Sequence, residues 1–208
     1  MKTSAFEYDN IADKIFLPIY DVITDDIIKY TNITTGKVLD IGCGGGHLGL
    51  TLLKKGDFQA DLCDINEEAL SIASKRAKDW NLIDKVNVSI QDVHNLTFED
   101  ETFDLIISRG SIGFWKNLEL AFKEIYRVLS PGGKTYIGTG LGNEETAKKI
   151  KIEMRKVNPD WPKCLEKKQK TMTTDEYIKM FDRLNFSYEI LDNPSCGRWF
   201  IITKEEEK

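Results

Sequence analysis

The sequence predicts an α/β fold, in which buried strands alternate with amphipathic helices. From Lys37 to about Ile202, short apolar runs rich in Val, Ile and Phe alternate with amphipathic segments, and this pattern is typical of a layered α/β domain. Five glycines lie within residues 42–49, directly after one of the apolar runs. A chain of 208 residues has room for one sizeable core, because a second independent core would be small. We therefore expect a single domain, residues 1–208.

The predicted elements follow one another along the chain. One or two helices are expected in residues 6–31, with an interruption near Pro18, because proline disfavours helix in the residue before it. Two later helices begin at the N-cap residues Asn66 and Asn117, and the second is ended by Pro131 and two glycines. The expected buried strands are residues 37–41, 58–65, 85–90, 103–108 and 134–140.

The alternation is interrupted after residue 140. Residues 141–184 predict a helical insertion that contains a locally basic stretch from Lys148 to Lys170. Residues 187–193 and 198–204 predict two strands joined by a Pro-Ser-Cys-Gly turn. We expect these strands to end the fold as a hairpin.

Composition excludes several classes of function. The formal net charge of -5 and a pI near 5.2 argue against a general binder of phosphate backbones. Glu7, Asp9 and Asp13 interrupt the N-terminus where an export signal needs an apolar run, and no later stretch has the length of a membrane span. The cysteines form no C-x-x-C pair and only two histidines are present, so a zinc site is poorly supported. We expect a cytoplasmic protein with free thiols and no metal.

The glycine-rich loop has two interpretations. Gly44, Gly46 and Gly49 match the G-x-G-x-x-G fingerprint of dinucleotide sites. However, the preceding strand ends at Ile41, so the fingerprint would have to begin at residue 42, and its third glycine would fall on His47. The carboxylate of Asp40 would also repel the pyrophosphate of NAD. S-adenosylmethionine carries no phosphate, and a carboxylate can bind its ammonium group directly.

The segment "VLDIGCGGG", residues 38–46, resembles the first motif of the class I S-adenosylmethionine-dependent methyltransferases. The resemblance implies that Asp40 lies near the methionine ammonium, that Asp64 holds both ribose hydroxyls and that Asp92 contacts the adenine amino group. Three acidic residues at the ends of three successive predicted strands suit the ligand-binding edge of an α/β sheet. The implied cofactor-binding residues are Asp40, Gly42, Cys43, Gly44, Gly46, Asp64, Ile65, Asp92, Val93 and Ser108, and the implied product is S-adenosylhomocysteine.

Residues 101–115 and 121–138 resemble the small-molecule branch of this family, which includes quinone-biosynthesis methyltransferases. The resemblance covers roughly residues 36–140 and implies a Rossmann-like three-layer sandwich with a seven-stranded, mostly parallel sheet and an antiparallel C-terminal strand. It divides the chain into an N-terminal helical cap (1–35), a cofactor-binding core (36–140), a helical insertion (141–184) and a C-terminal hairpin with its tail (185–208).

Catalytic residues are difficult to assign from the sequence. In methyl transfer the acceptor attacks in line with the departing sulfur, so the protein mainly positions the reactants and excludes water. A general base is needed only if the acceptor must lose a proton. "SRGSIGFW", which begins at Ser108, replaces the N/D-P-P-Y/F motif of enzymes that methylate nucleobase amino groups. The acceptor-side candidates are Arg109, Ser111, Trp115 and Tyr8.

Several of these residues have two interpretations. Arg109 is expected either to hold a carboxylate or phosphate of the acceptor, or to form an ordinary surface ion pair. His94 is expected to have a structural role in its loop rather than act as a base, and His47 to lie near the ligand tail or in solvent. The aromatic residues of the N-terminal helices form either a lid over the cofactor or part of the core; they are Tyr8, Phe16 and Tyr20.

The C-terminal part of the chain is expected to shape acceptor specificity through Trp161, Cys164, Cys196, Arg198 and Trp199. Cys164 and Cys196 would hold a soft acceptor such as arsenite if they came together, but buried or idle thiols are the simpler interpretation.

The sequence leaves three functions open. The first is methyl transfer from S-adenosylmethionine to an oxygen, nitrogen or carbon atom of an unidentified small molecule, and an anionic molecule is the kind that Arg109 would hold. The second is methylation of RNA or protein, for which the basic stretch is the support, although a basic helix face is usually just solvated. The third is a non-catalytic ligand-binding or partner protein with the same fold. Nucleic acid and membrane partners are disfavoured, and the oligomeric state is left unassigned.

Overall fold

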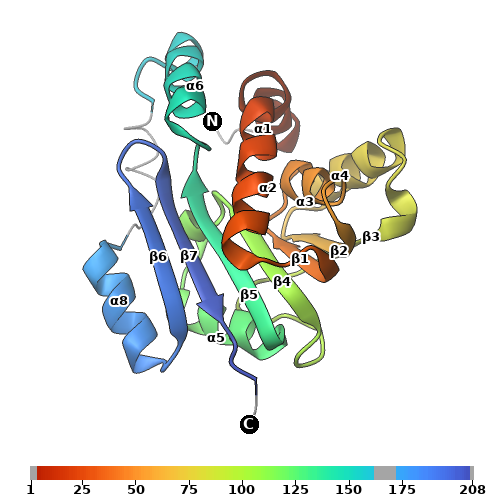
Figure 1. Ribbon diagram of the computed structural model, residues 1–208. Helices are drawn as coiled ribbons and strands as arrows, with labels where there is room; N and C mark the ends of the chain where they lie inside the picture. The colour runs from red at the N-terminus through yellow and green to blue at the C-terminus, as the bar shows by residue number, and fades with distance from the viewer. Residues whose placement is uncertain (1–3, 162–171, 207–208) are drawn as a thin grey trace.

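The computed structural model describes residues 4–161 and 172–206, and one seven-stranded sheet runs through them (Figure 1). The strand order is β3-β2-β1-β4-β5-β7-β6. Strands β1 to β5 pair in parallel, whereas β7 is antiparallel to both β5 and β6. The predicted Rossmann-like sheet is therefore confirmed. The strands are β1 Thr35–Ile41, β2 Asp57–Asp64, β3 Val86–Ile90, β4 Phe103–Arg109, β5 Leu129–Gly140, β6 Ser187–Asn193 and β7 Gly197–Thr203.

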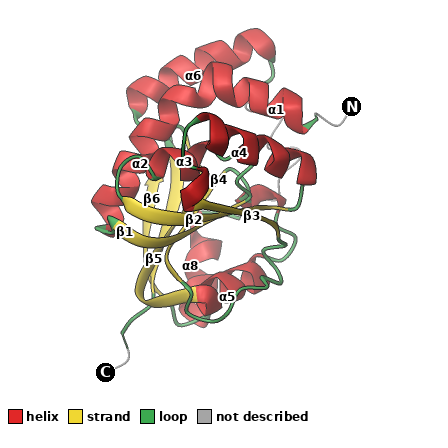
Figure 2. Ribbon diagram, turned by 90° about the vertical axis from the view of Figure 1, so that its right-hand side faces the viewer, coloured by secondary structure: helices red, strands yellow, loops and turns green. Residues whose placement is uncertain are grey.

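Helices cover both faces of the sheet, which makes three layers (Figure 2). One face packs against α2 Leu17–Thr31, α3 His47–Leu52 and α4 Glu67–Asp79, and the other against α5 Leu118–Val128 and α8 Thr174–Arg183. Because both faces are covered, central strands are continuous apolar runs rather than alternating ones. The side chains of Leu105, Ile106 and Ile107 in β4 are fully buried.

The N-terminal segment is helical, as expected, and its interruption is a π-helical turn. Helix α1 covers Ala5–Ile11, the turn η1 covers Ala12–Phe16, and α2 follows directly with Pro18 in its first turn. Proline is tolerated there because the first N–H groups of a helix have no intrahelical partner. Figure 1 shows α2 in front of the sheet and α1 above it; α2 packs beside α3 and α1 beside α4. The loop after β1 contacts α1, because a Cβ on Gly45 would collide with Asp9.

Asn66 and Asn117 are N-caps, as predicted, with side chains that accept backbone N–H groups of the first turn. The predicted end of the second helix was wrong. Helix α5 ends at Val128, and Leu129 already begins β5, so that Pro131 and the two glycines lie inside the strand. The pairing of β5 with β4 shifts register at this point, and a shift of this kind accommodates residues that cannot continue a regular ladder.

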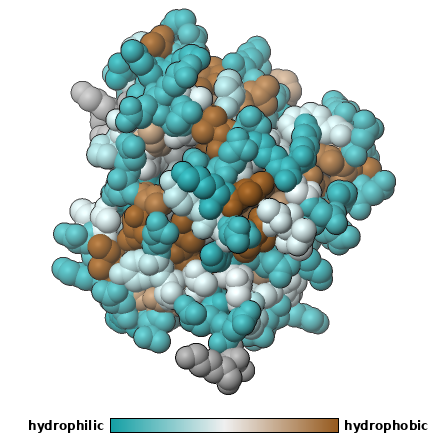
Figure 3. Space-filling model, in the orientation of Figure 1, coloured by the Kyte–Doolittle hydropathy of each residue, from teal (hydrophilic) through white to brown (hydrophobic). Residues whose placement is uncertain are grey.

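The remaining elements are short, apart from α6 Glu144–Val157, which packs beside α2 and η1. They are the 3-10 turns η2 Ile83–Lys85 and η3 Ile112–Phe114. Figure 3 shows mostly hydrophilic residues on the face seen in Figure 1, with apolar residues gathered over the β6–β7 side of the sheet. Among the described residues, no helix combines the length and the apolar character needed to cross a membrane.

Candidate active site

Three aspartates lie at the carboxyl ends of neighbouring strands. Asp40 is near the end of β1, Asp64 ends β2, and Asp92 follows β3 by two residues. Parallel pairing of β1 with β2 and of β2 with β3 brings these strand ends to one edge of the sheet. This is the edge at which open α/β sheets bind ligands.

Asp40 is sealed inside the protein, with a side chain only 1% exposed. Its Oδ2 accepts the backbone N–H of Gly49 at 2.9 Å. Burial raises the pKa of Asp40 to about 7; the Gly49 N–H opposes this shift, and the charge of Asp64 adds to it. A buried carboxyl of this kind is stabilised in its ionised form by a cation placed against it. The ammonium group of an amino acid would supply that cation.

Asp64 and Asp92 are progressively more open to solvent. Asp64 is half-buried and accepts the backbone N–H of Gly44 and of Asn66, each at 3.0 Å. The Asp92 side chain is 62% exposed and accepts the N–H of His94. That N–H and the His94 ring hold the pKa of Asp92 below its usual value. The predicted site is thus closed at its Asp40 end and open at its Asp92 end.

Two glycines, one in the loop after β1 and one in the loop after β4, each face open space. Gly44 has φ +53° and Gly110 has φ +78°, and a Cβ atom added at either position would meet no other atom within 4 Å. Both backbones are thus left-handed and face open space, which a side chain would fill. The carboxylates at this sheet edge would suit a ligand with an ammonium group and hydroxyls, and S-adenosylmethionine matches that chemistry. Of the other residues of the predicted cofactor set, Gly42, Cys43 and Gly46 lie in the loop after β1, Ser108 lies near the end of β4, and Ile65 and Val93 follow β2 and β3.

Ser108 and Ser111 join the ends of β1 and β4. The Ser108 hydroxyl is buried and donates to the Ile41 carbonyl at 2.6 Å, and the Ser111 hydroxyl lies beside it. A Cβ on Gly42 would collide with the Ser111 side chain. Both hydroxyls therefore hold the cofactor loop in place. Their direct roles toward cofactor or acceptor stay predictions, as do those of the exposed Ile65 and the buried Val93.

Arg109, the last residue of β4, is held between the sheet and the N-terminal helices. Its Nε donates to the carbonyl of Gly140 at 3.0 Å. Its guanidinium carbon lies 4.8 Å from the ring centre of Phe16 and 5.5 Å from that of Tyr20, which is cation–π geometry. Within the described residues, its two terminal nitrogens make no hydrogen bond. Both of these nitrogens can therefore donate hydrogen bonds to a ligand at this edge of the sheet.

The two histidines contact the loops around the site. His47 is only 3% exposed, and its Nε2 lies 2.7 Å from Asp13 Oδ1, so the alternative of a solvated His47 was wrong. Its ring stacks on Tyr20 with centres 4.9 Å apart. The Nε2 of His94 accepts the backbone N–H of Asn117 at 3.1 Å, which supports a structural role in the adenine-site loop.

Of the three cap aromatics, Phe16 and Tyr20 are buried, whereas Tyr8 is 56% exposed. Phe16 and Tyr20 pack into the core and also cover the site through Arg109 and His47. The alternatives of lid and core therefore do not exclude each other for these two residues.

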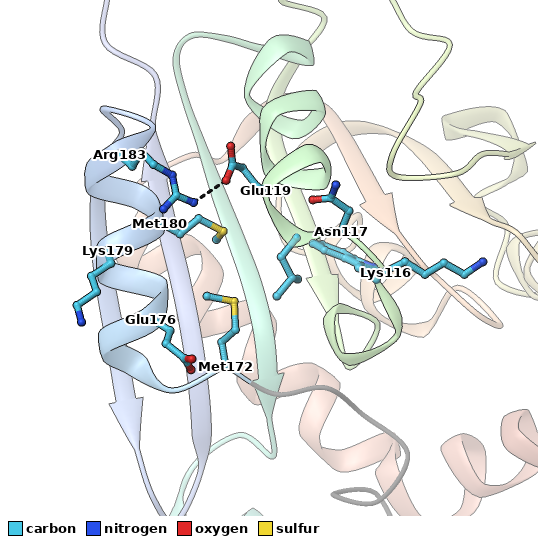
Figure 4. A pocket seen from close by; sticks show the side chains of 10 residues that line it. Lys116, Asn117, Glu119, Met172, Glu176, Lys179, Met180 and Arg183 are labelled. Atoms are coloured by element: carbon cyan, nitrogen blue, oxygen red, sulfur yellow. Dashed lines mark hydrogen bonds and ion pairs between the residues drawn. The ribbon is translucent and has the colours of Figure 1, made fainter.

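Trp115 and Arg109 contact different parts of the structure. It is buried, packs on Phe122 with ring centres 5.8 Å apart, and lines a groove between the start of α5 and α8 (Figure 4). The groove has a volume of about 730 Å³, and the Arg183–Glu119 ion pair closes one end of it. Arg109 instead contacts the N-terminal helices. The acceptor-side candidates are thus divided between two places.

The C-terminal specificity candidates are mostly structural. Trp161 and Trp199 are buried core residues, and Trp199 packs on Tyr136 with ring centres 4.5 Å apart. Arg198 donates to Asp192 at 2.8 Å. Cys196 is a buried free thiol, and Cys164 lies outside the described residues. In the described part of the chain, no three His, Cys, Asp or Glu side chains come together to form a metal site.

The sequence interpretation missed Arg76. This residue of α4 is buried and binds Asp9, Asp13 and the carbonyl of Gly45, in the centre of the glycine loop. Its position in an amphipathic helix gives no sign of this role. The spacing of Asp9 and Asp13 by four residues, which places both carboxylates on one face of a helix, is the signal that was available.

Comparison with known proteins identifies the family. A family model described as a methyltransferase domain matches residues 38–133. The ubiquinone/menaquinone biosynthesis C-methyltransferase UbiE of Rickettsia massiliae is 32% identical over 206 residues, which make up 97% of this chain and 70% of that relative. The match to the same-named protein of Rickettsia prowazekii is 31% identical and covers 62% of this chain and 54% of the relative, so it spans about half of the relative's length.

Solved structures agree with this family. A candidate S-adenosylmethionine-dependent methyltransferase of Methanococcus maripaludis is 40% identical with a TM-score of 0.90, and the match covers 98% of this chain and 93% of that one. An S-adenosylmethionine-dependent methyltransferase of Aquifex aeolicus, 16% identical with a TM-score of 0.71, shares the fold over 97% of this chain and 98% of its own. Fold and family together imply S-adenosylmethionine as the cofactor. This chain belongs to the class I S-adenosylmethionine-dependent methyltransferases.

Proposed function

We propose that this enzyme methylates a carbon atom of a small anionic acceptor, and that Arg109 binds the anionic group. The observation that carries this proposal is the guanidinium of Arg109, which has two unengaged nitrogens at the end of β4. A planar guanidinium binds a carboxylate through two parallel hydrogen bonds. The open space at Gly110, the next residue, gives an acceptor room beside it.

Carbon as the methylated atom is supported by the Rickettsia relatives, which are named as C-methyltransferases. An enolate or phenolate carries electron density on a neighbouring carbon, and a nearby cation favours this ionised form. Arg109 would therefore both orient such an acceptor and stabilise the anion that attacks. No separate general base is required for the methyl-transfer step if the acceptor is already ionised when it binds. With a phenolate, the proton left on the methylated carbon then passes to solvent, which restores the aromatic ring.

The chain's own residues would divide the work of binding and positioning. Bound S-adenosylmethionine supplies an activated methyl group. Asp40 would bind its ammonium, Asp64 its ribose hydroxyls and Asp92 its adenine amino group. The buried rings of Phe16 and Tyr20 would exclude water from the Asp40 end, which favours displacement by the acceptor over side reactions.

Titration calorimetry with S-adenosylmethionine, S-adenosylhomocysteine and NAD is the first test. We expect the first two ligands to bind and NAD not to bind, because the loop presents a carboxylate to the ligand. Binding of NAD alone would contradict the cofactor assignment. Acceptors are then screened with and without a carboxylate or acidic hydroxyl, by following S-adenosylhomocysteine formation.

The role of Arg109 is tested with Arg109→Lys and Arg109→Gln. We expect KM for an anionic acceptor to rise in both variants, and more in Arg109→Gln, while the affinity for S-adenosylmethionine changes little. Equal turnover of anionic and neutral acceptors by the wild-type enzyme would contradict an anionic acceptor.

The alternative of an RNA or protein substrate gains no support from the basic stretch. In its described part this stretch belongs to α6, where Lys149 pairs with Glu145 and Lys156 pairs with Glu153 at the surface. Paired, exposed charges of this kind are typical of an ordinary solvated helix.

A further inference from the structure

An ionic cluster joins the N-terminal helices to the cofactor loop. Arg76 of α4 donates from Nη1 to Asp9 Oδ1 at 3.0 Å and from Nη2 to Asp9 Oδ2 at 2.8 Å. Nη2 also lies 3.1 Å from both oxygens of Asp13, and Nη1 donates to the carbonyl of Gly45. One guanidinium thus binds α1, η1 and the centre of the glycine loop at once. The planar fork of arginine suits this arrangement, whereas a lysine ammonium would not reach all three partners.

His47 extends the cluster from the cofactor side. Its ring contacts Asp13 through Nε2 and stacks on Tyr20 of α2. Burial lowers the pKa of His47 despite the hydrogen bond to Asp13, so the neutral ring is favoured. Burial acts to raise the pKa of Asp13, but His47 and Arg76 outweigh it and the pKa is lowered, so this carboxylate stays charged. Arg76 therefore keeps Asp13 as an ionised partner.

The cluster is largely buried. Arg76 is 9% exposed and the Asp9 side chain 11%, whereas the Asp13 side chain is 49% exposed; all three residues line a cleft of about 500 Å³. A Cβ on Gly45 would collide with Asp9 and Arg76, so the loop and the N-terminal helices are in direct contact. Removing one partner from a buried ion pair leaves an uncompensated charge, which destabilises the arrangement strongly.

The same helices cover the inner end of the predicted cofactor site. Tyr20 and Phe16 pack against Arg109 and His47, and Asp40 beneath them is 1% exposed. Movement of the N-terminal segment away from Arg109 and His47 would therefore open this end of the site to a ligand. Such movement breaks the contacts of Arg76, because two of its three partners lie on the moving segment.

We propose that Arg76 is a positioning residue that latches the N-terminal helices, residues 5–31, onto the cofactor loop and thereby sets the rate at which cofactor and product exchange. This inference rests on the proposed cofactor site. A weaker latch increases the open fraction, and exchange occurs from the open form. The latch should therefore affect the rates of binding and release more than the chemistry of methyl transfer.

Stopped-flow release of S-adenosylhomocysteine tests the latch without an acceptor. We expect the release rate to rise about 10-fold in Arg76→Gln, a size within the usual range of coupling between sites, and the association rate not to fall. Arg76→Lys should lie between Arg76→Gln and the wild type, since it keeps the charge without the fork. Lys75→Gln is the matched control, because Lys75 is the preceding residue, is 78% exposed and, among the described residues, pairs only with Asp79.

A double-mutant cycle separates the latch from a general loss of structure. Asp13→Asn should speed release by itself, and combining it with Arg76→Gln should add little, because both substitutions break the same contacts. Fully additive effects, or an unchanged release rate in a folded Arg76→Gln protein, would overturn the latch. If Arg76→Gln does not fold, Arg76→Lys and Asp13→Asn decide the question in the same assay.

Amide hydrogen exchange provides a measurement that needs no cofactor. We expect residues 5–31 to exchange faster in Arg76→Gln than in the wild type, while β4 and β5 stay protected. Failure of the wild type to bind S-adenosylhomocysteine would count against the proposed cofactor site alone. Unchanged exchange in residues 5–31 would count against the latch alone.

Discussion

Among single residues, Asp40 is the most unusual, because its carboxyl is sealed in the protein with a pKa raised to about 7, mainly by burial. A raised pKa means that the protonated form is favoured in the free folded protein. The stability that this form contributes is fully present below the usual pKa of 3.8 and is lost as the pH rises through about 7. A bound ammonium reverses this preference by lowering the pKa again. Ligand binding should then release a proton wherever free Asp40 is protonated.

We therefore expect the affinity for S-adenosylmethionine to increase between pH 5.5 and 7 and then to level off. The increase approaches about 10-fold per pH unit, the limit for release of one proton. Calorimetry in buffers of different ionisation enthalpy measures the number of protons released on binding. Asp40→Asn should abolish this proton release. A pH-independent affinity in the wild type would show that Asp40 does not bind the ammonium.

Asp64 is expected to bind the ribose, although it also accepts the N–H groups of Gly44 and Asn66. Asp64→Ala should weaken binding of S-adenosylmethionine by about 1.5–3 kcal/mol for each charged hydrogen bond lost. Asp57→Ala at the opposite end of β2 is the control, because the Asp57 side chain is 88% exposed and, in the part of the chain that the structure describes, pairs only with Lys85. Equal affinities of the two variants for S-adenosylmethionine would contradict the assignment of Asp64 to the ribose.

At the level of elements, an aromatic cluster fixes α5 and α8 against the sheet. Phe122 of α5 is fully buried, and its ring contacts Trp115, Phe181 of α8 and Phe200 of β7. Phe122→Ala should lower the free energy of unfolding by about 3–5 kcal/mol, through lost burial and the cavity left behind. Leu120→Ala, two residues earlier and 42% exposed, should change it much less. Chemical denaturation measures both, and similar losses would contradict the assigned face of α5.

The sequence predicts elements well where one local signal decides them. Asn66 and Asn117 are N-caps because their side chains satisfy free N–H groups of their own helices. The end of α5 was misplaced because tertiary pairing with β4 draws Leu129 into β5 ahead of Pro131. Local stop signals do not contain that information.

In the candidate site, too, features that depend on local sequence were predicted and features that depend on tertiary packing were not. The three aspartates were predicted because motif and strand ends are both local features, and the sheet order brings them together. Burial of His47 and Arg76 was not predicted, because it depends on where the N-terminal helices dock. Trp115 lies near Arg109 in the sequence, but the chain between them carries its ring into the α5–α8 groove. Which side chains come together in this way depends on packing between distant segments, and this packing produces no periodic pattern in the sequence.

For the whole molecule, the cofactor should link the N-terminal helices, the glycine loop and the sheet into one more stable unit. A ligand present at 100 times its Kd and bound only to the folded state stabilises that state by about 2.7 kcal/mol. For a chain of 208 residues, this corresponds to a rise in Tm of about 5–11 °C. S-adenosylhomocysteine should produce this shift in thermal unfolding, and NAD at the same concentration should not. In Asp40→Asn the shift should become smaller at an unchanged ligand concentration, because the ammonium loses its charged partner. An equal shift in the variant would place the stabilising contacts elsewhere and remove Asp40 from the site.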